Sequence, residues 1–200
     1  MLSMKGSEFM KVKVGVSNHH VHLNEQDYHL LFGNDEFTKK VDLNQPGEFA
    51  SMQVVTIKGN KSEITNVRVL GPFRSYTQVE ISKTDSYKLG VNPPLASSGC
   101  LDEACDITIV GPCGEITRKA CIIANRHIHV DREILEQYNL KGINQVKVQV
   151  NGIKGGLLEN VYLKETAKAY FEIHLDTDDA NAFLLKQNDE VEIILPSSHN

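Results

Sequence analysis

The sequence predicts a mainly β protein made of two similar halves, each of them a small β-barrel. Short runs in which valine or isoleucine alternates with polar residues recur along the 200-residue chain, which is typical of half-buried strands. Several of these runs are separated by hairpin turns, such as residues 58–61 and residues 151–152. The pattern Asn-x-His-x-His occurs twice, at residues 18–22 and 125–129, and a similar order of elements follows each copy. Short strands joined in this way favour small barrels.

The elements expected in each half follow one order, which indicates duplication of a single unit. That order is a histidine strand, a short helix, a hairpin, a strand with a candidate ligand, a second short helix and closing strands. In addition to the histidine strands, strands are expected at residues 11–17, 52–57, 63–70, 77–81, 106–110, 115–123, 145–150, 155–162, 169–175 and 190–195. Helices are expected at residues 24–32, with Asn24 as the N-cap, and at residues 84–89, 131–138 and 177–185. Residues 35–51 are expected to be irregular, and the proline pair in residues 92–99 predicts a rigid connection.

Composition narrows the class of protein. A formal net charge of −5 argues against a nucleic-acid partner, because such binders carry basic patches. There is no apolar run of about 20 residues, the length that a membrane span requires. The cysteines lack C-x-x-C spacing and indicate reduced thiols in a cytoplasmic protein. Residues 1–10 are expected to be a tag or leader, since residues 6–9 look like a cloning remnant, and residues 196–200 a tail.

The paired histidines are the first candidate site residues. Alternate side chains of a strand point to the same face, so each Asn-x-His-x-His segment presents its two imidazoles together. In the corresponding later strands of the two halves, Glu80 and His174 supply a third group, and Glu172 shares a face with His174. Three protein ligands with open positions are typical of catalytic zinc, although cobalt, nickel or iron also suit these groups. The predicted ligand sets are His20, His22 and Glu80, and His127, His129 and His174.

Two arginines accompany these sets. Arg74 lies in a loop shortly before Glu80, and Arg126 directly precedes His127. A guanidinium offers a fork of donors that matches two oxygens of a phosphate or carboxylate. The alternative is that both are solvated loop arginines and that the histidines are ordinary surface residues. The glycine-rich Walker and dinucleotide-binding sequences are absent. A Gly-x-Ser-x-Gly sequence is also absent, so a serine-hydrolase function has no support.

Five segments together resemble the PduL-type phosphotransacylases, or phosphate propanoyltransferases. They are the two Asn-x-His-x-His segments and residues 71–74, 77–82 and 174–178, and the resemblance covers nearly all of residues 11–195. It implies two similar six-stranded β-barrels capped by short α-helices, a pseudo-twofold duplication with the first strand exchanged. Barrel A would contain residues 11–17 and 125–195. Barrel B would contain residues 18–124, with a loop or helix insertion at about residues 32–52.

The resemblance also implies an activity and a site. Members interconvert a short-chain acyl-CoA, such as acetyl- or propionyl-CoA, and phosphate with acyl phosphate and coenzyme A. Two zinc ions between the barrels would be held by the six ligands named above, and Arg74 would contact phosphate. Phosphate would attack the thioester directly, with zinc or Arg126 stabilising the oxyanion. A homodimer is also implied.

The sequence departs from the family pattern at His19 and Ala96, where arginines are usual. Both changes remove positive charge near a site for phosphate and coenzyme A. A long N-terminal targeting peptide is not seen, so a cytoplasmic enzyme is expected rather than one packed in a bacterial microcompartment. Two alternatives stay open: a dinuclear zinc hydrolase acting on a thioester or phosphate ester, and a non-catalytic metal-binding protein. Phosphate-dependent release of coenzyme A separates them from an acyltransferase.

Overall fold

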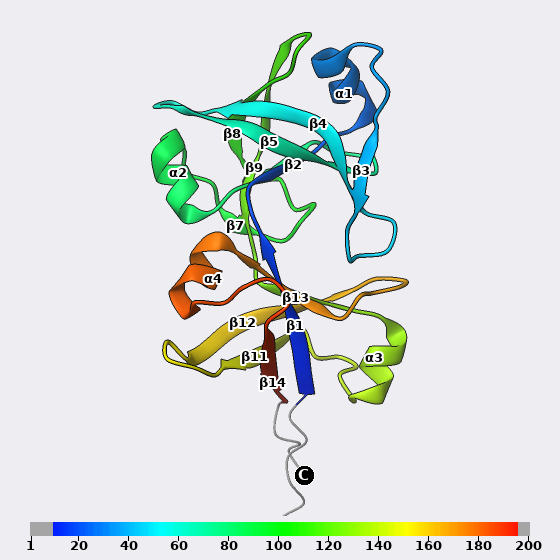
Figure 1. Cartoon of the computed structure of the whole chain (residues 1–200), viewed down its shortest axis with the longest axis vertical. Helices are drawn as coiled ribbons and strands as arrows, with labels where there is room; N and C mark the ends of the chain where they lie inside the picture. The colour runs from blue at the N-terminus through cyan, green and yellow to red at the C-terminus, as the bar shows by residue number, and fades with distance from the viewer. Residues whose placement is uncertain (1–9, 196–200) are drawn as a thin grey trace, which may run out of the picture. The chain divides into compact units, whose positions relative to one another are not determined.

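A computed structural model describes residues 10–195, which divide into two compact units (Figure 1). Unit 1 contains residues 10–16, 126–175 and 179–195 of the described chain, and unit 2 contains residues 17–125 and 176–178. The expected leader and the tail at residues 196–200 fall outside the described residues, with one exception. Met10 was expected to belong to the leader, but it begins the first strand and is buried.

Unit 1 contains a closed six-stranded barrel with the order β1-β13-β10-β12-β11-β14. Its first and last strands in the chain lie side by side and antiparallel, with Val12 opposite Val191 (Figure 1). In β1 the alternating residues of the sequence lie on opposite faces: Val12 and Val14 face the core, while Lys11 and Lys13 are exposed. The strands are β1 (Met10–Ser17), β10 (His127–Val130), β11 (Gln145–Val150), β12 (Gly156–Glu165), β13 (Glu172–Asp176) and β14 (Glu190–Ile194).

Unit 2 contains a second closed ring of six strands. Pairing runs from β2 to β5, β4, β8, β9 and β6, and β6 returns to β2. Two short strands, β3 (Lys39–Asp42) and β7 (Leu95–Ala96), extend the sheet at β4 and β9. The ring strands are β2 (His20–His22), β4 (Phe49–Lys58), β5 (Glu63–Gly71), β6 (Gln78–Glu80), β8 (Cys105–Val110) and β9 (Glu115–Ala124). The predicted mainly β fold with two six-stranded barrels is confirmed.

The two barrels repeat one arrangement and exchange a strand. In unit 2, β2 has a parallel neighbour, β5, and an antiparallel neighbour, β6. In unit 1, β10 likewise has a parallel neighbour, β12, and an antiparallel neighbour, β13. The chain enters β2 from β1, which belongs to the barrel of unit 1, and enters β10 from β9, which belongs to the barrel of unit 2. Each histidine strand therefore follows a strand of the other barrel.

Short helices begin where side chains can cap them. The Asn24 side chain accepts a hydrogen bond from the backbone N–H of Asp27 at 2.7 Å, as predicted, which satisfies a donor that the first turn leaves unpaired. Ser82 forms a capping box with Asp85, and Asp131 caps the next helix. The helices are α1 (Glu25–Phe32), α2 (Lys83–Leu89), α3 (Arg132–Gln137) and α4 (Thr177–Phe183).

The expectation of an irregular segment at residues 35–51 was wrong in part. β3 pairs antiparallel with β4, which already begins at Phe49. All four residues of β3 are exposed, so this edge strand has no buried face and no alternating pattern that could reveal it. The proline-containing connection likewise includes the two-residue strand β7.

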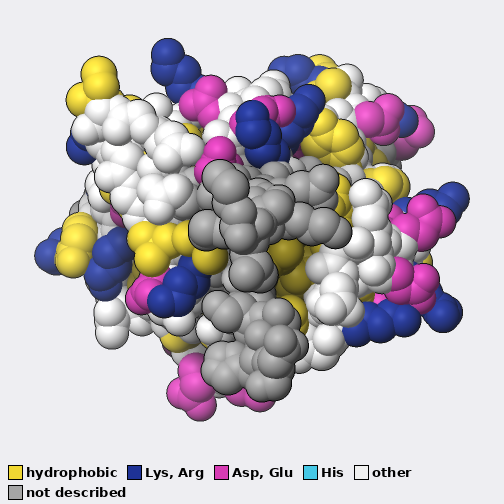
Figure 2. Space-filling model, turned by 90° about the horizontal axis from the view of Figure 1, so that it is seen from below, with side chains coloured by type: hydrophobic (Ala, Val, Ile, Leu, Met, Phe, Trp, Pro, Cys, Tyr) yellow, Lys and Arg dark blue, Asp and Glu magenta, His cyan; other side chains and the backbone are white. Residues whose placement is uncertain are grey.

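The described surface gives two further observations. On the face seen in Figure 2, lysine and arginine side chains lie among acidic ones rather than in one basic cluster. Within residues 10–195, none of the helices has the length and apolar character needed to cross a membrane.

Candidate metal centres

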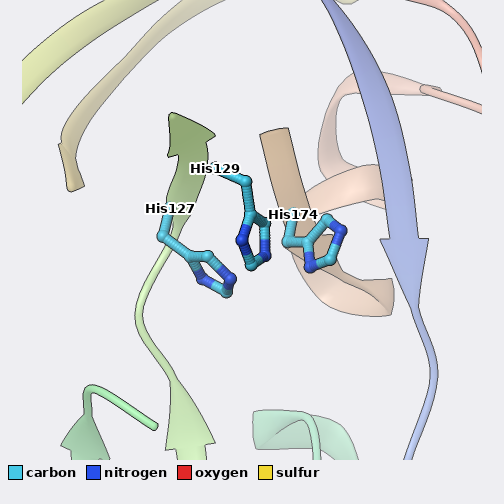
Figure 3. Close-up of side chains that lie close together, drawn as sticks. All are labelled: His127, His129 and His174. Carbon is cyan, nitrogen blue, oxygen red and sulfur yellow. The ribbon is translucent and has the colours of Figure 1, made fainter. Parts of the chain in front are cut away.

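The barrel of unit 1 brings three histidines together (Figure 3). His127 and His129 occupy alternate positions of β10, and the antiparallel pairing of β10 with β13 places His174 opposite His127. One ligand nitrogen of each imidazole lies within 4.8 Å of the others. The ring centroids of His129 and His174 are 4.6 Å apart, and those of His127 and His129 are 4.9 Å apart. The three predicted groups therefore form one cluster.

The barrel of unit 2 builds the matching cluster from β2 and β6. His20 and His22 stand at alternate positions of β2, and Glu80 lies opposite His20 on β6. Their ligand atoms also lie within 4.8 Å of one another, with His20 Nε2 and Glu80 Oε2 3.5 Å apart. Glu80 and His174 occupy equivalent register positions in the two barrels, because Glu80 faces His20 as His174 faces His127.

Both clusters have the chemistry of a divalent metal site. Each offers imidazole or carboxylate donors from one face of two adjacent strands, a set that suits zinc and leaves a position for a further ligand. His20, His22 and His129 are buried, while Glu80, His127 and His174 are partly buried. Burial alone would lower the pKa of His20, but the charge and hydrogen bond of Glu80 outweigh it, and the pKa is raised. The residues present therefore fit a bound cation.

Arg74 is tied to the unit 2 cluster through polar side chains. Its Nη1 donates to Ser98 Oγ at 2.9 Å, and the amide of Gln78 donates to the same hydroxyl at 2.9 Å. Gln78 Nε2 also donates to Glu80 Oε1 at 2.6 Å. Arg74 Nη2 forms an ion pair with Glu48 at 3.1 Å. The predicted arginine is thus a mostly buried part of the network around Glu80, and not a solvated loop residue.

Arg126 is also held in place. Its guanidinium makes a two-point contact with Asp179, with Nε–Oδ2 and Nη2–Oδ1 distances of 2.7 Å and 2.6 Å. A third donor, Nη1, contacts the backbone oxygen of Glu159 at 3.1 Å. The planar fork of arginine matches a carboxylate in this way. Asp179 therefore fixes the orientation of Arg126 beside the first ligand of its strand.

His19, one of the two departures from the family pattern, contacts Asp85 and is not one of the cluster residues. Its Nδ1 lies 3.1 Å from Asp85 Oδ2 at the start of α2, and this hydrogen bond, stronger than the opposing effect of burial, lowers the pKa of Asp85. Ala96, the other departure, lies in β7 and pairs with Ala124. His19 therefore serves the cap of a neighbouring helix.

Several residues that complete the network were missed in the sequence. Gln78 and Ser98 contact the unit 2 cluster or Arg74, and Glu48 and Asp179 bind the two arginines. For Glu172, the sequence predicted a shared strand face with His174 but no contact with that ligand. The available signal was spacing: Gln78 and Glu172 each stand two residues before a ligand, and therefore on the same strand face.

Fold and clusters together define a duplicated β-barrel protein with a three-ligand cluster and an adjoining arginine in each barrel. The family model of phosphate propanoyltransferase matches residues 13–186. A phosphate propanoyltransferase of Thermotoga maritima is 46% identical over 184 residues, which are 90% of this chain and 88% of the relative. One of Priestia megaterium is 46% identical over 190 residues, 94% of this chain and 88% of the relative. The chain belongs to the phosphate propanoyltransferase family, and so to the acyltransferase class of enzymes.

Proposed function

We propose that the protein interconverts a short-chain acyl-CoA and phosphate with acyl phosphate and coenzyme A, and that each cluster holds one zinc ion. Acetyl and propionyl groups are the proposed acyl chains. Family membership supports the phosphate acyltransferase reaction. The two three-ligand clusters, which share one register, support the metal sites.

The observation that carries the phosphate side of the proposal is the connection between Arg74 and Glu80. Arg74 is joined through Ser98 and Gln78 to a carboxylate that would bind the metal. A guanidinium and a divalent cation both attract the oxygens of phosphate, and this attraction is strongest where water is largely excluded. With 18% of its side chain exposed, Arg74 has this partly shielded character.

The proposed reaction is a direct transfer. A phosphate oxygen attacks the thioester carbonyl carbon, a C–O bond forms, the C–S bond breaks, and the sulfur leaves as thiolate and takes up a proton. Bound zinc would supply positive charge for phosphate and for the developing oxyanion. Arg74 would hold and orient phosphate. Arg126, fixed by Asp179, would stabilise the oxyanion. Because no acyl group is transferred to the protein, the kinetics should show a ternary complex, and a trapped acyl-enzyme would contradict this mechanism.

The test is a coenzyme A release assay with acetyl-, propionyl- and butyryl-CoA, with and without phosphate, together with metal analysis of the purified protein. Release that requires phosphate and yields acyl phosphate supports the proposal. Release without phosphate indicates a zinc hydrolase with water as the nucleophile. Absence of turnover with bound metal indicates a metal-binding protein without catalysis. Light scattering during gel filtration tests the homodimer that we also propose.

A further inference from the structure

Both clusters share a feature outside the six ligands. Two residues before the third ligand, on the same strand face, stands a buried polar side chain that contacts this ligand. In unit 2, Gln78 Nε2 lies 2.6 Å from Glu80 Oε1. In unit 1, Glu172 Oε2 lies 2.9 Å from His174 Nε2. Gln78 is 0% exposed and Glu172 3% exposed, so each contact is shielded from water.

The two contacts differ in polarity in the way that the ligands require. Glu80 is a carboxylate, which only accepts hydrogen bonds when ionised, and its neighbour Gln78 is an amide that donates. His174 is an imidazole, which must donate from one ring nitrogen to leave the other for a metal, and its neighbour Glu172 is a carboxylate that accepts. The duplicated position therefore carries a donor where the ligand is an acid and an acceptor where the ligand is a base.

Each partner is itself held in place. Gln78 Oε1 accepts from the backbone N–H of Gly99 at 2.8 Å, and its Nε2 also donates to Ser98 Oγ at 2.9 Å. The amide is thus fixed at both ends, so its NH₂ group faces Glu80.

Glu172 is held by close packing against β1 and by a contact with Gln187. A Cβ atom at position 15 would lie 2.7 Å from Glu172 Cδ and 2.9 Å from His174 Cδ2. A side chain at this position would therefore displace the Glu172–His174 pair, against which β1 packs at Gly15. Gln187 Nε2 approaches Glu172 Oε1 at 3.5 Å, and its own Oε1 accepts from the backbone N–H of Val16 at 2.8 Å.

We propose that Gln78 and Glu172 are positioning residues that orient Glu80 and His174 for a divalent cation. His174 then donates from Nε2 to Glu172, which leaves Nδ1 as the nitrogen with a lone pair for the metal. Partners of this kind fix the ring orientation and raise the basicity of a ligand, and their loss costs about 10- to 100-fold in metal affinity. The inference rests on the proposed metal centres.

The experiment measures zinc dissociation constants by competition with a chromogenic chelator. Glu172→Met keeps the length of the side chain but removes the acceptor, and it should weaken one class of zinc site about 100-fold. Glu172→Gln keeps a neutral acceptor and should weaken the same site about tenfold. Gln78→Met removes the donor and should weaken the other site about tenfold or more. Thr77→Val is the matched control, because Thr77 is a buried polar neighbour of Gln78 whose hydroxyl donates to Asp27 at 2.6 Å.

The outcomes separate the two proposals. If the wild-type protein binds no zinc, the metal centres fail, and the positioning roles fail with them. If the wild-type protein binds zinc and Glu172→Gln binds it equally well at every site, the positioning role is wrong while the metal centres stand. If Glu172→Met does not fold, the zinc affinity of Glu172→Gln alone decides whether Glu172 positions His174. Thr77→Val should bind zinc as the wild type does, even though it unfolds more easily. Equal loss in that control would show that general destabilisation, rather than ligand orientation, lowers the affinity.

Discussion

His20 on β2 lies directly opposite Glu80 on β6, in the antiparallel register that also sets His127 opposite His174. Residues directly opposite each other on one sheet face have Cβ atoms about 5 Å apart. Two ligands from one strand and one from its neighbour are therefore sufficient to form a three-ligand cluster, and the barrel needs no loop to complete it. Because each cluster is built within its own barrel, we expect the two sites to lose metal independently.

The first prediction concerns metal content. Glu80→Ala should remove the zinc of unit 2 and leave that of unit 1, and His174→Ala should do the reverse, because each unit supplies its own three ligands. Elemental analysis of the purified variants measures the loss. The double variant should contain no zinc. His29→Ala is the control, since His29 lies on α1, where its Nδ1 contacts the backbone oxygen of Gly33 at 2.7 Å. Loss of both ions in a single variant would contradict independence of the sites.

The second prediction concerns phosphate. Arg74→Ala should lower kcat/KM for phosphate by about 10- to 150-fold, the equivalent of about 1.5–3 kcal/mol for hydrogen bonds to a charged group. Its zinc content should not change, since Arg74 is not one of the cluster residues. Arg132→Ala, which removes an exposed arginine paired with Glu136, should behave as the wild type. Initial rates at varied phosphate concentration provide the measurement, and an unchanged kcat/KM would remove Arg74 from the mechanism.

Strand periodicity and the repeated Asn-x-His-x-His pattern located the histidine strands, and helix capping by Asn24 was predicted because it depends only on neighbouring residues. The number of strands in each barrel and the exchange of β1 came from the family resemblance. Alternation of residues cannot show which barrel a strand joins, because both barrels bury the same kind of aliphatic face.

Strand periodicity could not predict which residues contact the site residues. Glu48 reaches Arg74 from 26 positions away, and Asp179 reaches Arg126 from 53 positions away. Such contacts depend on the strand order, which pairs segments that are distant in the chain. The edge strand β3 was missed for a different reason, since all its residues are exposed and nothing in its composition marks it.

The third prediction follows from the ion pair between Arg74 and Glu48. In the proposed mechanism, phosphate competes with the Glu48 carboxylate for the Arg74 guanidinium, which lies 3.1 Å from that carboxylate. Glu48→Gln removes the competing charge and should lower KM for phosphate about two- to fivefold, the range expected for a partly exposed ion pair. Saturation curves for phosphate measure this change. An increase in KM would show instead that Glu48 orients Arg74 for binding.

The fourth prediction concerns the stability of unit 2. Asp27 is buried and accepts from Arg118 Nη2 at 2.7 Å and Thr77 Oγ1 at 2.6 Å. Burial would raise the pKa of Asp27, but these hydrogen bonds outweigh it and the pKa is lowered. Asp27→Asn should therefore lower the free energy of unfolding by about 2 kcal/mol at pH 7.

The pH dependence of that difference follows from the sign of the shift. A lowered folded-state pKa contributes stability above the unfolded-state pKa of about 3.9, and the contribution disappears as the pH falls through the lower folded-state pKa. Denaturant curves of wild type and Asp27→Asn should thus converge in acid. Asp42→Asn, in the exposed pair with Lys39, is the control and should change stability little at any pH. A constant difference between wild type and Asp27→Asn down to pH 2 would contradict this account.

The fifth prediction concerns a thiol pair. Cys105 on β8 is the register partner of Cys121 on β9. A hydrogen bond from the Cys121 thiol, partly opposed by burial, lowers the pKa of Cys105 to about 7, while the pKa of Cys121 is raised. Because the thiolate is the reactive form, alkylation of Cys105 by iodoacetamide should rise with pH around a midpoint near 7. Cys121→Ala removes the donor and should move the midpoint upward, and Cys105→Ser should abolish this reaction. Peptide mass spectrometry after timed alkylation measures each site, and an unchanged midpoint in Cys121→Ala would show that the hydrogen bond does not control this thiol.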